Sequence, residues 1–379
     1  MRNALGIALV LSASLAGGWG MANAGPAGQT PPAARVQPPA PGPSLSEEQR
    51  ASAAANYQTY CALCHGPDRA GHANDEAPSL RTPSLYRTSY PLAVFDALRY
   101  GRPGTPMGGY SDEIGGPLSR QDMVLMARWL QEQAGVPFNS SGPPLPSLPK
   151  GDARHGASVY ARECASCHGD AGQGGTGTAL RNPAMLALTP DGFLLEAILH
   201  GREGTQMEGF AGRLSLRDAA SVLAWMRHDN SGGQLRPARM DPPPPPEAWI
   251  LNPKGKPPQF TLKDGMYVSA ADLHEALKAK PRIVLLDTRV MSMWQAGHIA
   301  GAVPMPYYSS REEVMRNIPR DGTWIVGYCE CPRAAAESVI RRLREQGVRN
   351  TAVVWEGIGG WVAAGYPTVQ GTVENAPSP

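Results

Sequence analysis

The sequence contains one short cysteine–histidine pattern twice, as Cys61-Ala-Leu-Cys64-His65 and as Cys164-Ala-Ser-Cys167-His168. The spacing C-x-x-C-H is the pattern of covalent c-type haem attachment, in which the two thiols bond to the haem and the histidine reaches the iron. A zinc site made from the same residues would be one ligand short of four. The chain is therefore predicted to carry two covalently bound haem c groups and to transfer electrons.

A repeated methionine loop offers each iron a second axial ligand. When the two halves are matched, Met107 and Met207 fall at the same position, within Gly-Thr-x-Met. A thioether ligand stabilises ferrous relative to ferric iron and so raises the reduction potential. Two histidines, His72 and His200, remain open as alternative ligands.

The residues around these motifs predict that each copy is a small helical domain. Ser46 followed by Glu47 and Glu48 is typical of a helix start, and this helix leads into the first C-x-x-C-H. Apolar residues at helical spacing after each methionine loop predict a closing amphipathic helix. They are Met123, Met126, Ala127 and Leu130 in the first copy, and Ala219, Val222, Leu223 and Met226 in the second.

This order of helix, C-x-x-C-H, methionine loop and final helix resembles the class I cytochrome c family over residues 46–230. The resemblance implies two all-α domains, each built around one covalently attached haem. It also implies that His65 and Met107 ligate one iron, and that His168 and Met207 ligate the other.

The sequence pattern changes near position 260, where short apolar strands alternate with helices. Residues 283–287, 324–328 and 352–355 are predicted strands, and residues 334–346 form a predicted helix between the last two. Alternation of this kind indicates an α/β domain with a mainly parallel sheet.

Motifs in this region resemble the rhodanese homology domain over residues 260–371. Leu286-Asp287-Thr288-Arg289 precedes Gly297-His298-Ile299, and Ile325-Val-Gly-Tyr328-Cys329 matches the strand that presents the family's catalytic cysteine. The resemblance implies that Cys329 is the nucleophile that holds sulfane sulfur as a persulfide. It also implies that Arg333 and the loop amides stabilise the anionic sulfur, and the start of a helix favours a thiolate in any case.

The loop after Cys329 departs from the common family pattern C-x-x-G-x-R. Pro332 replaces the glycine and removes one amide donor, and Glu330 brings a negative charge next to the nucleophile. Cys331 is a further catalytic candidate, either as the group that resolves a persulfide or as the nucleophile itself. An active sulfurtransferase and an inert docking module therefore both remain open. We interpret three other polar residues as structural: Asp287, Arg289 and His298.

The net charge and the placement of the cysteines argue against two other features, a nucleic-acid partner and a structural disulfide. The 379-residue chain has 35 lysines and arginines against 33 aspartates and glutamates, a formal net charge of +2, so nothing indicates a nucleic-acid partner. All six cysteines have candidate roles in the motifs above, which leaves none for a structural disulfide between distant segments.

The N-terminus has the features of an export signal. Arg2, an uncharged apolar run from Ala4 to Ala16 and the segment Ala22-Asn23-Ala24 predict a signal peptide that is cleaved before Gly25. The apolar run is shorter than the ~20 residues that a spanning helix needs. We therefore expect a periplasmic protein without a stable membrane span after cleavage.

The sequence predicts a multidomain chain. The predicted order is a signal peptide (1–24), a proline-rich tether (25–45), the first cytochrome-like domain (46–137), a linker (138–150), the second cytochrome-like domain (151–230), a proline-rich linker (231–259), the rhodanese-like domain (260–371) and a tail (372–379).

Two functional hypotheses follow from these motifs. In the first, a periplasmic dihaem cytochrome couples electron transfer to thiosulfate or persulfide chemistry at Cys329. In the second, the haem domains carry electrons between a separate dehydrogenase and a terminal oxidase or cytochrome, and the rhodanese-like domain docks or senses a partner.

Overall fold

The computed structural model describes residues 44–71, 77–87, 92–102, 105–137, 146–229, 241–330 and 333–370. The predicted signal peptide and almost all of the predicted tether lie outside these ranges, as do His72, Cys331 and Pro332. Among the residues that the structure describes, no helix is both long and apolar enough to cross a membrane.

The first helical unit covers residues 44–137 and begins with a capped helix. The Ser46 hydroxyl accepts a hydrogen bond from the Gln49 amide, and the Gln49 side chain accepts one from the Ser46 amide. This reciprocal cap satisfies two amides at the start of the helix. The helices are α1 (Glu47–Tyr60), α2 (Ala62–His65), α3 (Ser84–Arg87), α4 (Leu92–Tyr100) and α5 (Arg120–Gln133).

The second helical unit, residues 146–229, repeats this order of helices. They are α6 (Ala153–Glu163), α7 (Ala165–His168), α8 (Pro183–Leu188), α9 (Asp191–His200) and α10 (Leu216–Arg227). A side chain at Gly156 on α6 would overlap the Ser221 carbonyl of α10, so the two helices cross at backbone distance. The equivalent position of α1 is Ala53, which is buried in the first unit.

A tyrosine–tryptophan pair joins the first and last helix of each unit. The ring centroids of Tyr57 and Trp129 lie 5.5 Å apart, and those of Tyr160 and Trp225 lie 4.0 Å apart. Each tyrosine hydroxyl donates a 2.6 Å hydrogen bond to the carbonyl of the glycine that follows C-x-x-C-H. The helix crossing therefore positions the haem motif as well as the core.

The C-terminal α/β unit contains a five-stranded, fully parallel sheet in the order β1-β5-β4-β2-β3, which confirms the predicted α/β class. The strands are β1 (Tyr267–Val268), β2 (Ile283–Asp287), β3 (Val303–Pro304), β4 (Trp324–Tyr328) and β5 (Thr351–Val354). The helices are α11 (Ala270–Lys278), α12 (Met291–Ala296), α13 (Arg311–Arg316), α14 (Ala334–Glu345) and α15 (Gly357–Ala363).

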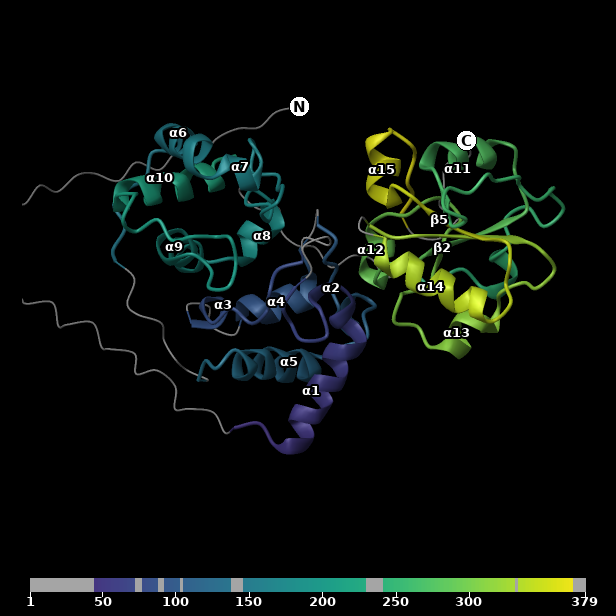
Figure 1. Ribbon diagram of the computed structural model, residues 1–379, viewed down its shortest axis with the longest axis horizontal. Coiled ribbons are helices and arrows are strands. Elements are labelled where there is room, and N and C mark those ends of the chain that lie inside the picture. The colour runs from purple at the N-terminus through teal and green to yellow at the C-terminus, as the bar shows by residue number, and fades with distance from the viewer. Residues whose placement is uncertain are drawn as a thin grey trace, which may run out of the picture. The chain divides into compact units, whose positions relative to one another are not determined.

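Helices cover both faces of this sheet, as Figure 1 shows for the α/β unit. Ile283 and Leu285 of β2 face α11 and α15, whereas Val284 and Leu286 face α13 and α14. Because both faces are covered, all five residues of β2 are buried. The carboxyl ends of the central strands β2 and β4 lie side by side, with Asp287 paired to Tyr328, and Cys329 follows at this edge.

The expected linker at 231–259 needs a correction, because its second half packs on the α/β unit. The Asp241 amide and carbonyl hydrogen-bond with the Gln295 side chain, and the buried Trp249 indole donates to the Pro244 carbonyl. Leu251 pairs with Ile283 of β2. The five consecutive prolines at 242–246 therefore belong to the α/β unit, because the large apolar surface of Trp249 is buried in its core.

Replacing Ser215 with alanine is predicted to destabilise the second helical unit by about 1 kcal/mol. The Ser215 hydroxyl caps α10 by accepting a hydrogen bond from the Asp218 amide. Ser158→Ala is the matched control, because the Ser158 hydroxyl donates to a carbonyl within its own helix. Denaturant unfolding followed by circular dichroism measures both variants, and equal stabilities would contradict the role of this cap.

Asp218 should give the second unit a pH-dependent stability. Hydrogen bonds with the Ser215 hydroxyl and the His155 ring lower the pKa of Asp218 to about 2. A carboxyl with a lowered pKa stabilises the fold above its ordinary pKa, and this contribution disappears as the pH falls from about 4 towards 2. The stability lost in Asp218→Asn should therefore shrink over this window in unfolding curves; a constant loss would contradict the prediction.

Candidate functional site: two haem motifs and a cysteine loop

Each C-x-x-C-H histidine is held by a carbonyl oxygen. His65 and His168 are both buried, and their Nδ1 atoms lie 2.9 Å from the Pro78 oxygen and 2.7 Å from the Thr178 oxygen. Nδ1–H donation to a carbonyl makes Nε2 the nitrogen with the lone pair, which is the arrangement of a metal-binding histidine. Both histidines therefore fit the proximal side of a haem iron.

The first cysteine of each motif stands at the start of a one-turn helix and is partly or fully withdrawn from solvent. Burial raises the pKa of Cys61 to about 12 and that of Cys164 to about 11. Both thiols are therefore uncharged near neutral pH, and a thioether to haem has no ionisable proton, so these sulfurs can stay buried without a charge. Cys64 is less buried than Cys61, and Cys167 is exposed.

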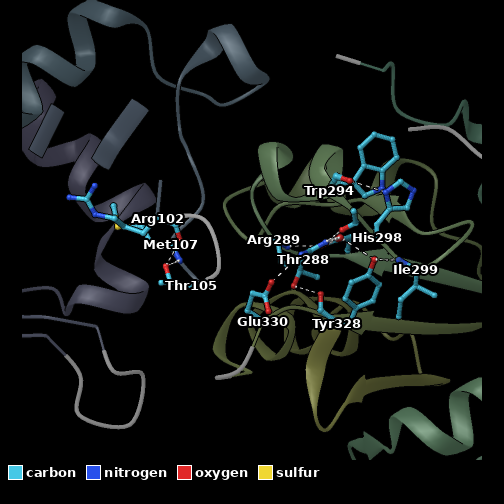
Figure 2. Close-up of polar contacts among 12 residues, drawn as sticks. Arg102, Thr105, Met107, Thr288, Arg289, Trp294, His298, Ile299, Tyr328 and Glu330 are labelled. Carbon is cyan, nitrogen blue, oxygen red and sulfur yellow. Dashed lines mark hydrogen bonds and ion pairs between the residues drawn. The ribbon is translucent and has the colours of Figure 1, made fainter. Parts of the chain in front are cut away.

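The two methionine loops close in the same way. The Arg102 amide donates to the Met107 carbonyl at 2.6 Å, and the Thr105 hydroxyl bridges the Arg102 carbonyl and the Met107 amide at 2.6 and 3.2 Å (Figure 2). The second loop repeats these three hydrogen bonds with the corresponding residues Arg202, Thr205 and Met207. Both predicted methionine ligands thus lie in a fixed backbone loop.

A glycine makes each closure feasible. Gly101 and Gly201 have φ angles of 71° and 72°, and a Cβ at either one would overlap the Met107 or Met207 carbonyl oxygen. Only a residue without a side chain fits both the left-handed backbone and this contact.

The arginine of each methionine loop carries a charge that is poorly solvated. Burial lowers the pKa of Arg102, and it lowers that of Arg202 to about 10. Both side chains are partly buried. A partly buried cation favours a nearby anion, and haem brings carboxylates, so both arginines suit a haem pocket. The sequence could have identified these two arginines, because Gly-Arg stands at the same place in both copies of the repeat.

The alternative ligand His200 ends α9 with a half-exposed side chain, 3.7 Å from the Glu196 carboxylate. In the described part of the chain no cluster of three histidine, cysteine, aspartate or glutamate side chains could hold a metal ion.

The rhodanese-like motif places Cys329 directly after β4, buried with 3% of its surface exposed. Its carbonyl accepts a 2.9 Å hydrogen bond from the Ile358 amide at the start of α15. Cys329 thus follows a buried strand, and helix α14 begins at Ala334.

A buried ion-pair chain runs from the end of β2 to the residue after Cys329. Arg289 donates to the Asp287 carboxylate from Nε at 2.9 Å and from Nη2 at 2.6 Å, and its Nη1 reaches Glu330 at 3.1 Å (Figure 2). Burial alone would lower the pKa of Arg289, but these carboxylates raise it above its usual value. No sequence pattern predicts the ion pair between Arg289 and Glu330, which are 41 positions apart in the chain.

Arg333 is held on an aromatic surface. Its guanidinium lies 3.8 Å from the centroid of the Trp355 ring, donates to the Trp355 carbonyl at 3.3 Å and lies 3.7 Å from the Glu337 carboxylate. His298 stacks on Trp294 and is held by its carbonyl, and burial lowers the pKa of this histidine.

Comparison with known families agrees with these motifs. The family described as cytochrome C oxidase, cbb3-type, subunit III matches residues 48–130 and 151–226, and the rhodanese-like domain family matches residues 269–364. The chain thus joins a cytochrome c region, which implies covalently bound haem c, to a C-terminal rhodanese-like domain.

Three known proteins resemble parts of the chain. A dihydro-heme d1 dehydrogenase of Pseudomonas aeruginosa is 37% identical over 82 residues, 22% of this chain and 16% of that protein. The cbb3-type cytochrome c oxidase subunit FixP of Bradyrhizobium sp. is 26% identical over 203 residues, 51% of this chain and 64% of FixP. A rhodanese-related protein of Thermoplasma volcanium, of known structure, is 30% identical over 27% of this chain and 97% of its own, with a TM-score of 0.24. The chain thus spans less than two thirds of either curated relative.

Gly201→Ala is predicted to remove methionine ligation at the second haem motif, because the added methyl group collides with the Met207 carbonyl. Gly204→Ala is the matched control, since Gly204 has a similar φ of 75° but open space around its Cα. The weak long-wavelength band of His/Met-ligated ferric haem should fall by about half in the first variant only. Loss of the band in both variants, or in neither, would contradict the prediction.

Proposed function

We propose that the protein is a periplasmic dihaem c-type cytochrome whose two class I cytochrome c domains serve a sulfur-handling rhodanese domain. The observation that supports this most directly is the repeat itself. Each helical unit has a carbonyl-held histidine after C-x-x-C and a closed loop carrying a methionine. The ligand pairs would be His65 with Met107 and His168 with Met207.

The residues of each unit prepare a place for the haem. The two cysteines would fix it covalently, the Nδ1-bonded histidine would present Nε2, and the partly buried arginine of the methionine loop would offer a cation to a carboxylate. When bound, a haem supplies an iron that exchanges one electron between its ferric and ferrous forms. Export to the periplasm rests on the signal features of residues 1–24.

At the rhodanese site, Cys329 is proposed to accept sulfane sulfur, with Cys331 able to resolve the persulfide. Arg333 is the least supported member of the proposed set, because its guanidinium is committed to Trp355 and Glu337. If the Cys329 persulfide and the Cys331 thiol were oxidised to a trisulfide, one S–S bond would form and two protons and two electrons would be released, one electron for each haem.

A second candidate function is that of an electron carrier with a non-catalytic rhodanese domain. It is favoured by the sequence similarity to a protein named as a dehydrogenase and to an oxidase subunit. Its redox partner would then be a separate dehydrogenase or a terminal oxidase or cytochrome.

Anaerobic addition of thiosulfate or a persulfide donor to the fully ferric protein tests direct coupling. If sulfur chemistry at Cys329 is coupled to the haems, the spectrum should show ferrous haem, and Cys329→Ser combined with Cys331→Ser should abolish this reduction. Haems that stay ferric would exclude direct coupling. Unchanged turnover of the double variant with a separate redox partner would support the carrier function.

A further inference from the structure

The charged residues around Cys329 affect which sulfur donor can react with it, an inference that rests on the proposed sulfur function of Cys329. Asp287, Arg289 and Glu330 form one connected group at the carboxyl ends of β2 and β4. Two carboxylates share one guanidinium, so with both ionised the group carries a net negative charge.

Glu330 directly follows Cys329, and its carboxylate is held in a defined position. Its Oε1 is held by Arg289 at 3.1 Å, and its Oε2 lies 3.8 Å from the point where a Cβ on Gly359 would stand. Its carboxylate thus lies between the end of β2 and α15, the helix whose first turn binds the Cys329 carbonyl. Its side chain keeps 25% of its surface exposed and is therefore accessible from solvent.

The positive charges of this region are directed elsewhere. Arg289 bonds to Asp287 and to the Gly297 carbonyl as well as to Glu330, which occupies all three of its nitrogens. Arg333 lies on the Trp355 ring beside Glu337, and the Lys263 ammonium lies 3.6 Å from the centroid of the same ring. The two residues between Glu330 and Arg333 are a cysteine and a proline, which bring no cation.

We infer that Glu330 is a specificity-determining residue that disfavours thiosulfate and makes a neutral or weakly charged persulfide, R–S–SH, the preferred sulfur donor of Cys329. Thiosulfate would bring two negative charges next to the Glu330 carboxylate. At separations of a few ångströms, repulsion between like charges near a protein surface lowers a rate about ten-fold or more.

The transfer itself is balanced for either donor. The Cys329 thiolate attacks the outer sulfur, a new S–S bond forms at Cys329, and the S–S bond of the donor breaks. Thiosulfate leaves as sulfite with two negative charges, whereas R–S–SH leaves as the thiolate R–S⁻ and its proton stays on the transferred sulfur. No oxidant is needed, so donor choice can be measured separately from the haems.

The test compares loading of Cys329 by thiosulfate and by a small alkyl persulfide in the full-length protein, measured by mass spectrometry as the gain of one sulfur atom. Glu330→Gln keeps a hydrogen-bonding side chain but removes the charge. It should raise the rate with thiosulfate about ten-fold and change the persulfide rate less than about two-fold. Glu312→Gln, in the exposed first turn of α13, makes the same change in net charge as a control and should alter neither rate.

Ionic strength separates a charge effect from a structural one. Added inert salt should speed thiosulfate loading of the wild-type protein and should have less effect on Glu330→Gln, because screening weakens the repulsion. Glu330→Ala provides a second variant if Glu330→Gln does not fold. An unchanged donor ratio in the Glu330 variants would overturn the inference while leaving the sulfur function intact. Loading by neither donor in any protein would overturn both.

Discussion

The close crossing of the first and last helices is the contact on which each helical unit depends. At Gly156 the backbone of α6 touches the Ser221 carbonyl of α10, and a larger side chain would drive the two helices apart. The same crossing brings Tyr160 against Trp225 and directs its hydroxyl to Gly169, directly after His168. The same helix crossing therefore contributes to the core packing and positions the C-x-x-C-H motif. Because α10 follows the methionine loop, the crossing also fixes where that loop ends.

Parts of this arrangement could be read from the sequence because they are local. C-x-x-C-H, the helix caps and the Gly-Arg…Met match are short patterns, and the amphipathic spacing of residues 219–226 predicts the buried face of α10 correctly. The parallel sheet was predictable for a similar reason, since buried strands alternate with helices.

Other features could not be predicted because they depend on distant residues or on competition between contacts. The Pro78 and Thr178 carbonyls that hold the histidines come from loops without a motif. The proline run was expected to be a spacer, but Trp249 anchors it to the α/β unit. The sequence predicts a structural role for Arg289. It could not predict the ion pair of Arg289 with Glu330, because the two residues are far apart in the chain and meet only when β2 and β4 pair.

The docked proline segment also changes how far the chain can reach. With residues 241–259 held against the sheet, eleven residues, 230–240, join the last described residue of the second helical unit to the α/β unit. Such a stretch spans at most about 40 Å even when fully extended. A connection of this length keeps the α/β unit at an effective concentration on the order of millimolar around the second helical unit. Encounters between the second helical unit and the α/β unit would then be intramolecular. A weak affinity between the two units would be enough, and the encounter rate would not depend on the protein concentration.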